Sequence, residues 1–186
     1  ISCDDAKTIG KRYAHNVTVD NCTFTGNGGE NVVAMRYRQC NDMTVTNTTA
    51  SGLHSLMWAT GGTGNISIDN VSVLNSYNGA SFGTSSNVTV NKFTVNSKGQ
   101  YGYGLRAKAS GAYKMIVTNS NITADAPILL RETTSAAYEL TLSGNTLTTS
   151  KDYQLIVCAK DYEEGEPLEE PAVECNITGA EGLTSF

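Results

Sequence analysis

The chain alternates apolar residues with threonine or serine in short segments that recur at a nearly constant interval. The period of two within each segment predicts β-strands, and the many β-branched residues favour them further. The segments open 22 to 27 residues apart, except for a last step of 35 residues. Such a period predicts a solenoid, in which each repeat stacks on the one before it. The opening residues are Val17, Met43, Ile66, Val88, Met115, Leu140 and Cys175.

Each repeat continues after its first strand in the same order. An asparagine follows about four residues after the opening residue, as at Asn21, Asn47, Asn70 and Asn119, and the fourth repeat has Asn91-Lys92. A second short strand and a third apolar stretch complete the repeat, so we expect three short strands per coil and three parallel sheets. Asparagine tolerates the left-handed backbone of a tight corner, and stacked copies can hydrogen-bond along the axis. We therefore expect an asparagine ladder at this corner.

The repeated unit "NVTVDNCTFTG" resembles the right-handed parallel β-helix of pectin-lyase-like proteins. The resemblance covers roughly Asp4 to Leu147 and is specific for the fold. That superfamily includes polysaccharide lyases, polygalacturonase-type hydrolases, phage tailspikes and bacterial surface adhesins. The resemblance therefore leaves the reaction open. A β-sandwich would also show many short strands, but it does not account for an asparagine corner at a near-fixed step.

We therefore predict an all-β fold, a single-stranded right-handed parallel β-helix solenoid of about seven coils of three short strands, in a single domain over residues 1–186. An irregular acidic loop at 160–172 precedes the last coil, with five glutamates between Glu163 and Glu170. We expect this loop to be exposed. Its alternative role as a cation site is not favoured, because Ca²⁺ takes 6–8 oxygen ligands. Cys158 and Cys175 flank the loop and are candidates for a disulfide.

The composition limits the partners of the protein. The net charge of −5 argues against nucleic acid as the main partner. No apolar run approaches the length of about 20 residues that a membrane-spanning helix needs. None of the five cysteines forms a C-x-x-C pair, so we expect no zinc site. The chain begins at Ile1, without a methionine, and we expect it to be a piece of a longer protein.

Basic and aromatic residues recur on the third strand of successive repeats. With Met35, Met57, Ala80, Leu105 and Leu130 pointing inward, the residue after each points outward. Arginine binds carboxylates in a planar fork, and tryptophan offers a flat apolar face with an N–H group. This row predicts a groove for an acidic or neutral glycan, and the alternative is a solvated sheet face. The predicted ligand-binding residues, including the "GQYGYG" loop, are Arg36, Arg38, Trp58, Tyr101, Tyr103, Arg106, Lys108 and Arg131.

Candidate acids for catalysis lie near the N-terminus. "SCDDAKTIG", with Asp4 and Asp5, looks like the paired-aspartate segment of polygalacturonase-type hydrolases, and two carboxylates are what glycoside hydrolysis needs. The family pattern implies a Gly-His-Gly at the next turn, where this chain has Asn27-Gly28-Gly29-Glu30. Its Arg-x-Lys at 106–108 lies several coils away. A lyase would use the arginines as bases or clamps, with Ca²⁺ as its cofactor.

We therefore expect an exported β-helix module, of a cell-surface or fibre type, that interacts with polysaccharide and lacks a complete catalytic site. Asp4, Asp5 and Glu30 are the weak catalytic candidates, and no metal or other cofactor is expected unless the protein is a lyase. One alternative is a polysaccharide lyase or polygalacturonase-like glycoside hydrolase. The other is a purely structural or oligomerising spacer. Expected locations are extracellular, the cell surface or the virion, and a homo-oligomer or further flanking coils would cover the coil ends.

Overall fold

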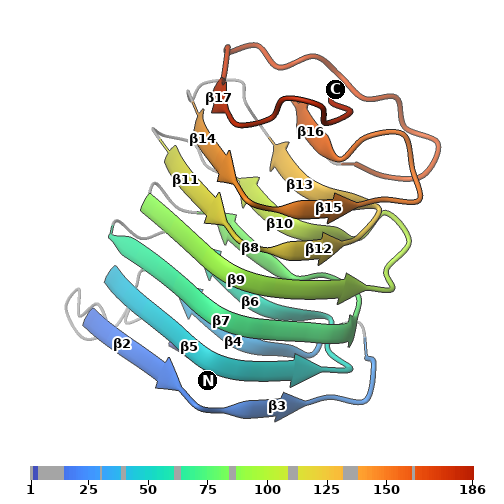
Figure 1. Ribbon diagram of the computed structural model, residues 1–186. Helices are drawn as coiled ribbons and strands as arrows, with labels where there is room; N and C mark the ends of the chain where they lie inside the picture. The colour runs from blue at the N-terminus through green and yellow to red at the C-terminus, as the bar shows by residue number, and fades with distance from the viewer. Residues whose placement is uncertain are drawn as a thin grey trace, which may run out of the picture.

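The alternating segments form parallel β-strands that stack along one axis (Figure 1). The computed structural model describes residues 2–3, 15–29, 31–38, 41–60, 64–83, 87–108, 113–131, 138–160 and 162–186. Within these ranges the chain contains strands and no helix. The predicted all-β parallel solenoid is therefore confirmed.

The strands fall into two parallel sheets. In the described part of the chain the first sheet has seven strands and the second has ten. The first contains β1 (Ser2–Cys3), β4 (Val33–Arg38), β6 (Ser55–Thr60), β8 (Ala80–Gly83), β10 (Tyr103–Lys108), β13 (Ala126–Arg131) and β16 (Leu155–Cys158). The second contains β2 (His15–Asp20), β3 (Thr23–Thr25), β5 (Asn41–Ser51), β7 (Asn65–Ser76), β9 (Asn87–Ser97), β11 (Tyr113–Thr118), β12 (Asn121–Thr123), β14 (Tyr138–Ser143), β15 (Thr146–Thr148) and β17 (Asn176–Thr178).

We expected three sheets and the structure has two, because the strands on both sides of the asparagine corner belong to one bent sheet. The strands β5, β7 and β9 run through the corner as single long strands. Their corner residues Asn47, Asn70 and Lys92 have φ angles of 48°, 54° and 50°. One left-handed residue turns the chain sharply enough to redirect the strand. Both halves of the strand then keep their pairing with the neighbouring coils.

The asparagine ladder at this corner is confirmed. Asn70 Nδ2 donates to Asn47 Oδ1 at 2.8 Å. In the fourth repeat the corner residue is Lys92, so the preceding residue, Asn91, makes the ladder hydrogen bonds instead. Asn91 Nδ2 donates to Asp69 Oδ1 at 2.6 Å, and Asn119 Nδ2 donates to Asn91 Oδ1 at 2.9 Å. These three side-chain bonds thus tie four successive coils together where the backbone turns.

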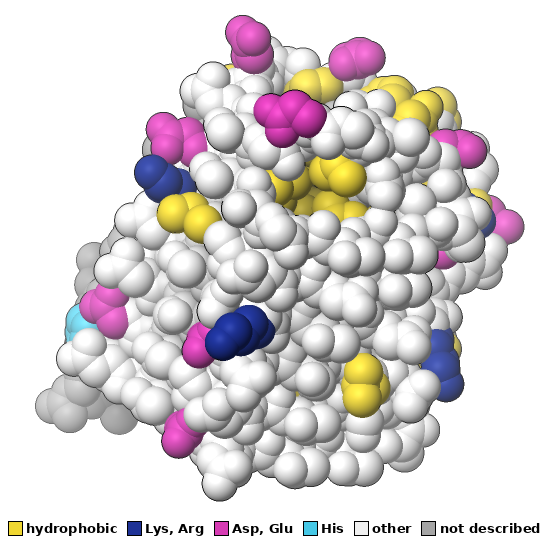
Figure 2. All heavy atoms as spheres, viewed as in Figure 1, with side chains coloured by type: hydrophobic (Ala, Val, Ile, Leu, Met, Phe, Trp, Pro, Cys, Tyr) yellow, Lys and Arg dark blue, Asp and Glu magenta, His cyan; other side chains and the backbone are white. Residues whose placement is uncertain are grey.

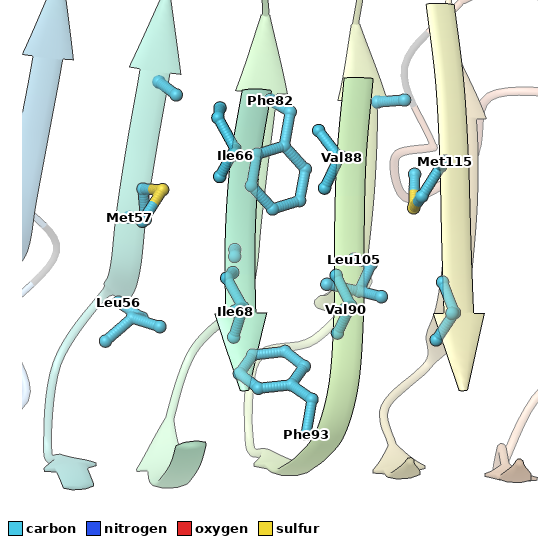
Figure 3. Packing of buried hydrophobic residues seen from close by; sticks show 14 of the residues in the cluster. Leu56, Met57, Ile66, Ile68, Phe82, Val88, Val90, Phe93, Leu105 and Met115 are labelled. Carbon is cyan, nitrogen blue, oxygen red and sulfur yellow. The ribbon is translucent and has the colours of Figure 1, made fainter. Parts of the chain in front are cut away.

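The core fills the space between the two sheets (Figure 3). Met57, Phe82 and Leu105 of the first sheet face Ile68 and Val90 of the second, and each is fully buried. Met35 and Ala80 are also fully buried, so the predicted inward positions are confirmed for these coils. Apolar burial of this kind is the main favourable term in folding. It also determines which residues of the same strands point outward.

A second, smaller core lies on the outer face of the first sheet at its C-terminal end. Leu129, Ile156 and Cys158 belong to it and are almost fully buried. Partly buried residues from the turn before β16, the acidic segment and the C-terminus pack over them, namely Tyr153, Tyr162, Leu168 and Phe186. The acidic segment is therefore not the simple exposed loop that the sequence predicts. Its glutamates at 163, 164, 166 and 170 are exposed, while two apolar side chains hold it on the sheet.

The candidate disulfide between Cys158 and Cys175 does not form. The two thiols are not bonded to each other. The Cys158 thiol lies 2.9 Å from the carbonyl oxygen of Lys160, and the Cys175 thiol lies 3.8 Å from that of Val173. Partial burial raises the pKa of the Cys175 thiol. The acidic segment is held instead by packing and by a backbone hydrogen bond of 3.0 Å from Ala159 N to Glu169 O.

No helix in the described ranges is long and apolar enough to cross a membrane.

Candidate ligand-binding cleft

The outer face of the first sheet carries the predicted row of basic and aromatic residues. Arg36 pairs with Trp58, Trp58 with Ser81, and Ser81 with Arg106. These residues therefore lie side by side in successive coils, about 4.8 Å apart along the axis. The outer face of the second sheet differs in character, since charged side chains of both signs lie scattered over it (Figure 2).

Arg131 does not lie in this row. Leu129 occupies the position next to Arg106, and Arg131 pairs with Lys108, two residues further along the strand. The sequence places Leu130 opposite Leu105, whereas Ile128 is the residue found there. The segment "APILLR" is nearly all apolar, so its alternation does not fix the register. A shift by two residues keeps Arg131 on the outer face but moves it away from the row.

Trp58 is held by charged and aromatic neighbours. The guanidinium carbon of Arg36 lies 5.5 Å from the centroid of the Trp58 ring, and the Arg36 side chain is exposed. The ring of His54 meets the Trp58 ring edge-on, with centroids 5.3 Å apart and an interplanar angle of 85°. The Trp58 Nε1–H group is buried and has no hydrogen-bond partner among the described residues. A buried donor without a partner is costly, so this group favours an acceptor from a ligand.

Arg106 is fixed on the sheet by two contacts. Its Nε donates to Ser81 Oγ at 3.1 Å, and its guanidinium carbon lies 4.8 Å from the centroid of the Tyr103 ring. Cation–π and hydrogen-bond contacts together restrict the rotamers of a long side chain. The Arg106 guanidinium is therefore held in one orientation and does not move freely in solvent.

A cleft of about 370 Å³ opens above Arg106 and joins four of the eight predicted ligand-binding residues. A volume of this size falls within the range of about 300–1,000 Å³ that ligand sites occupy. The predicted residues in its lining are Trp58, Tyr101, Tyr103 and Arg106. The lining also includes His54, Tyr77, Asn78, Gly99, Gln100, Leu129, Tyr162, Glu163 and Glu164.

The remaining predicted residues lie elsewhere. Arg36 stands beside the cleft against the Trp58 ring. Lys108 and Arg131 are half-buried on the outer face of the first sheet, outside the cleft lining. The backbone of Arg38 ends β4, and its side chain lies outside the described part of the structure.

One wall of the cleft is built from the turns that precede β6 and β8. The Asn78 backbone N–H donates to the His54 carbonyl oxygen at 2.8 Å, and the His54 ring stacks on Tyr77 with centroids 5.8 Å apart. Asn78 Oδ1 accepts from the backbone N–H of Tyr103 at 3.0 Å. This bond orients the amide so that its Nδ2 lies 3.3 Å from His54 Nε2. The buried Asn78 amide thus links the histidine wall to the strand that carries Arg106.

The opposite end is built from the turn before β10 and the acidic segment. Tyr101 has a φ of 56°, and its backbone N–H donates to Asp125 Oδ2 at 2.9 Å. The Tyr101 ring meets the Tyr162 ring with centroids 5.1 Å apart and an interplanar angle of 69°. The ammonium of Lys151 lies 4.8 Å from the Tyr101 centroid. Burial, assisted by the charge of Asp125, raises the pKa of Tyr162, so its hydroxyl stays protonated and able to donate.

The weak catalytic candidates Asp4, Asp5 and Glu30 lie outside the described residues. Within the described ranges no group of three histidine, cysteine, aspartate or glutamate side chains is placed to hold a metal ion. The carboxylates that the cleft does carry are those of Glu163 and Glu164, both exposed at its rim. The cleft therefore offers aromatic faces, one oriented guanidinium and two carboxylates.

Sequence reasoning missed part of this lining. His54 and Tyr77 each lie three residues before an inward residue of the first sheet, Met57 and Ala80. A repeat alignment extended upstream of these strands would have placed both rings in neighbouring coils. No comparable signal exists for Tyr162, because it belongs to the segment in which the repeat is lost.

The comparisons with known proteins agree with this architecture. The family model described as the right handed beta helix region matches residues 7–162. The chain therefore belongs to the right-handed β-helix family. No curated protein and no solved structure gave a significant match to the chain.

Proposed function

We propose that the protein is a glycan-binding module that holds a short segment of polysaccharide in the cleft above Arg106. The observation that carries this proposal is that the cleft joins Trp58, Tyr101, Tyr103 and Arg106. Trp58 belongs to one coil, whereas Tyr101, Tyr103 and Arg106 belong to the coil two steps further along. The chemistry of all four residues suits a sugar. The proposal also includes export of the chain to the cell surface, a fibre or a virion, which rests on the family resemblance alone.

The chemistry of the cleft supports a sugar ligand. Flat aromatic faces pack against the C–H faces of sugar rings, and indole or phenol groups add a polar contact at the edge. The Trp58 Nε1–H group supplies a buried donor that has no partner among the described residues. Arg106 supplies a charged donor for a hydroxyl or a uronate carboxylate, while Glu163 and Glu164 supply acceptors for hydroxyl groups.

We propose binding without cleavage. Hydrolysis would need two carboxylates on opposite sides of one glycosidic bond, and the two glutamates of the cleft are neighbours on one segment. The alternative is a lyase or hydrolase that uses residues outside the described part of the chain. An assay for unsaturated products and reducing ends on polygalacturonate, alginate, chondroitin and xylan, with and without Ca²⁺, separates the two functions, because turnover would contradict the proposal.

The proposal is tested by direct binding to the same four polysaccharides, measured by calorimetry and by affinity electrophoresis. We expect at least one of them to bind the wild-type protein and to bind Trp58→Ala much more weakly. The matched control is Lys114→Ala, since Lys114 is exposed in β11 of the other sheet and pairs only loosely with Glu139 at 3.5 Å. The absence of binding to all four polysaccharides would overturn the proposed function.

A further inference from the structure

We infer that the cleft recognises the end of a glycan chain rather than its interior. This inference rests on the proposed function, because it concerns how a sugar chain would lie in the same cleft. The inference follows from how the outer face of the first sheet is covered along the axis of the solenoid.

Exposure falls along the row of outward residues from the N-terminal coils to the C-terminal ones. Arg36 is exposed, and Trp58 and Arg106 are half-buried. Ser81, the small residue between them, has an exposed fraction of 5% and accepts a hydrogen bond from Arg106. Leu129 and Ile156, which continue the row, have exposed fractions of only 2% and 0%. The outer face is therefore accessible at one end of the row and sealed at the other.

The seal is made by the acidic segment together with Tyr153 and Phe186. Tyr162 packs on the small core that contains Leu129 and Ile156, and Leu168 packs beside it. The Tyr162 ring also contacts Tyr101, which lies in the turn at the side of the cleft. The sheet, the turn and the acidic segment thus meet at one point. A sugar chain that lies along the row must stop there.

The sealed end also has the chemistry of a chain terminus. A terminal sugar has a free hydroxyl where an internal sugar has a glycosidic bond. Glu163 and Glu164 line the cleft next to Tyr162 and offer acceptors for that hydroxyl. The protonated Tyr162 hydroxyl is a donor at the same place. An internal sugar would instead direct its next neighbour into the Tyr162 ring.

The experiment compares polymers with short oligomers of the same sugar. Polygalacturonate, alginate, chondroitin and xylan are each presented to the full chain as intact polymer and as hydrolysed oligomers at equal mass concentration. End recognition predicts that the number of binding sites rises in proportion to the number of chain ends. Equal numbers of sites for polymer and oligomers would overturn the inference and leave the proposed function standing. Binding to none of the probes would overturn the proposed function itself.

A second measurement opens the sealed end. Tyr162→Ala is expected to raise the number of binding sites on intact polymer towards the number found with oligomers. The matched control is Tyr153→Ala, because Tyr153 packs on the same small core but does not line the cleft. The control should keep the wild-type ratio between the number of binding sites on oligomers and the number on intact polymer. An unchanged ratio in a folded Tyr162→Ala protein would overturn the inference. If that variant does not fold, the comparison of polymer and oligomer binding by the wild-type protein still tests the inference.

Discussion

The ring of Tyr162 lies against the ring of Tyr101, with centroids 5.1 Å apart, and so joins the acidic segment to a turn of the solenoid. Tyr101 is positioned by Asp125, whose other carboxylate oxygen accepts from Ser150 Oγ at 2.9 Å. Through this contact an irregular segment becomes the end wall of a cleft. The repeat builds the floor of the site, and the segment that departs from the repeat limits its length.

Removal of the Trp58 ring is expected to weaken glycan binding. Trp58→Ala loses a large apolar face and the buried Nε1–H donor together, so we expect affinity to fall by about 10- to 30-fold, or roughly 1.4–2 kcal/mol. Trp58→Phe keeps an aromatic face and loses the donor, so its affinity should lie between those of the wild-type protein and Trp58→Ala. Calorimetry measures both values, and Trp58→Ala with wild-type affinity would exclude the ring from the site.

Substitution at the asparagine corner is expected to destabilise the fold in two separable ways. Asn70→Ala places a Cβ-bearing residue without a local hydrogen bond at a φ of 54° and removes the bond to Asn47. We expect a loss of about 1–2 kcal/mol in the free energy of unfolding. Asn70→Gly tolerates the backbone and loses only the side-chain bond, so we expect a smaller loss of about 0.5–1 kcal/mol. Denaturant titration gives both values, and an equal loss in the two variants would contradict the backbone contribution.

At the corner of the fourth repeat, a substitution is expected to stabilise the fold. Lys92 has a φ of 50°, although lysine has none of the local hydrogen bonding that helps asparagine in this conformation. Asn91 already makes the ladder bonds of this coil. Lys92→Asn should therefore raise the free energy of unfolding by about 0.5–1 kcal/mol. Lys98→Asn, at an exposed position outside the corner, controls for the change in charge and should have little effect.

The ladder should also be sensitive to acid at its N-terminal end. Asp20 Oδ1 accepts from Thr46 Oγ1 at 2.5 Å and from Asn47 Nδ2 at 2.9 Å, and these bonds lower the pKa of Asp20 below its ordinary value of 3.8. A lowered pKa in the folded state means that the stabilisation is present above the ordinary value and is lost as pH falls through the folded pKa. The wild-type protein should therefore lose more stability than Asp20→Ala between about pH 5 and about pH 2. Parallel stability curves for the two proteins over that range would contradict this role.

Much of the fold could be predicted because the solenoid repeats one local rule. Apolar residues at positions such as Met57, Ala80 and Leu105 are buried in the interior, and the asparagine corner adopts the left-handed backbone that asparagine tolerates. The same rule places Arg36, Trp58 and Arg106 on one outer row. It fails at Arg131, because the apolar segment before it has no alternation to fix its register.

The sequence by itself determined the period, the inward residues and the corner asparagines, since each depends on side chains that repeat at fixed positions. Only the tertiary structure decided that the strands on both sides of the corner join one bent sheet, that Tyr162 and Leu168 return to cover the outer face, and that Cys158 and Cys175 stay apart. The physical reason is that outward side chains and irregular segments obey no period. Their positions depend on contacts between residues distant in the chain, which form only when the coils are already stacked.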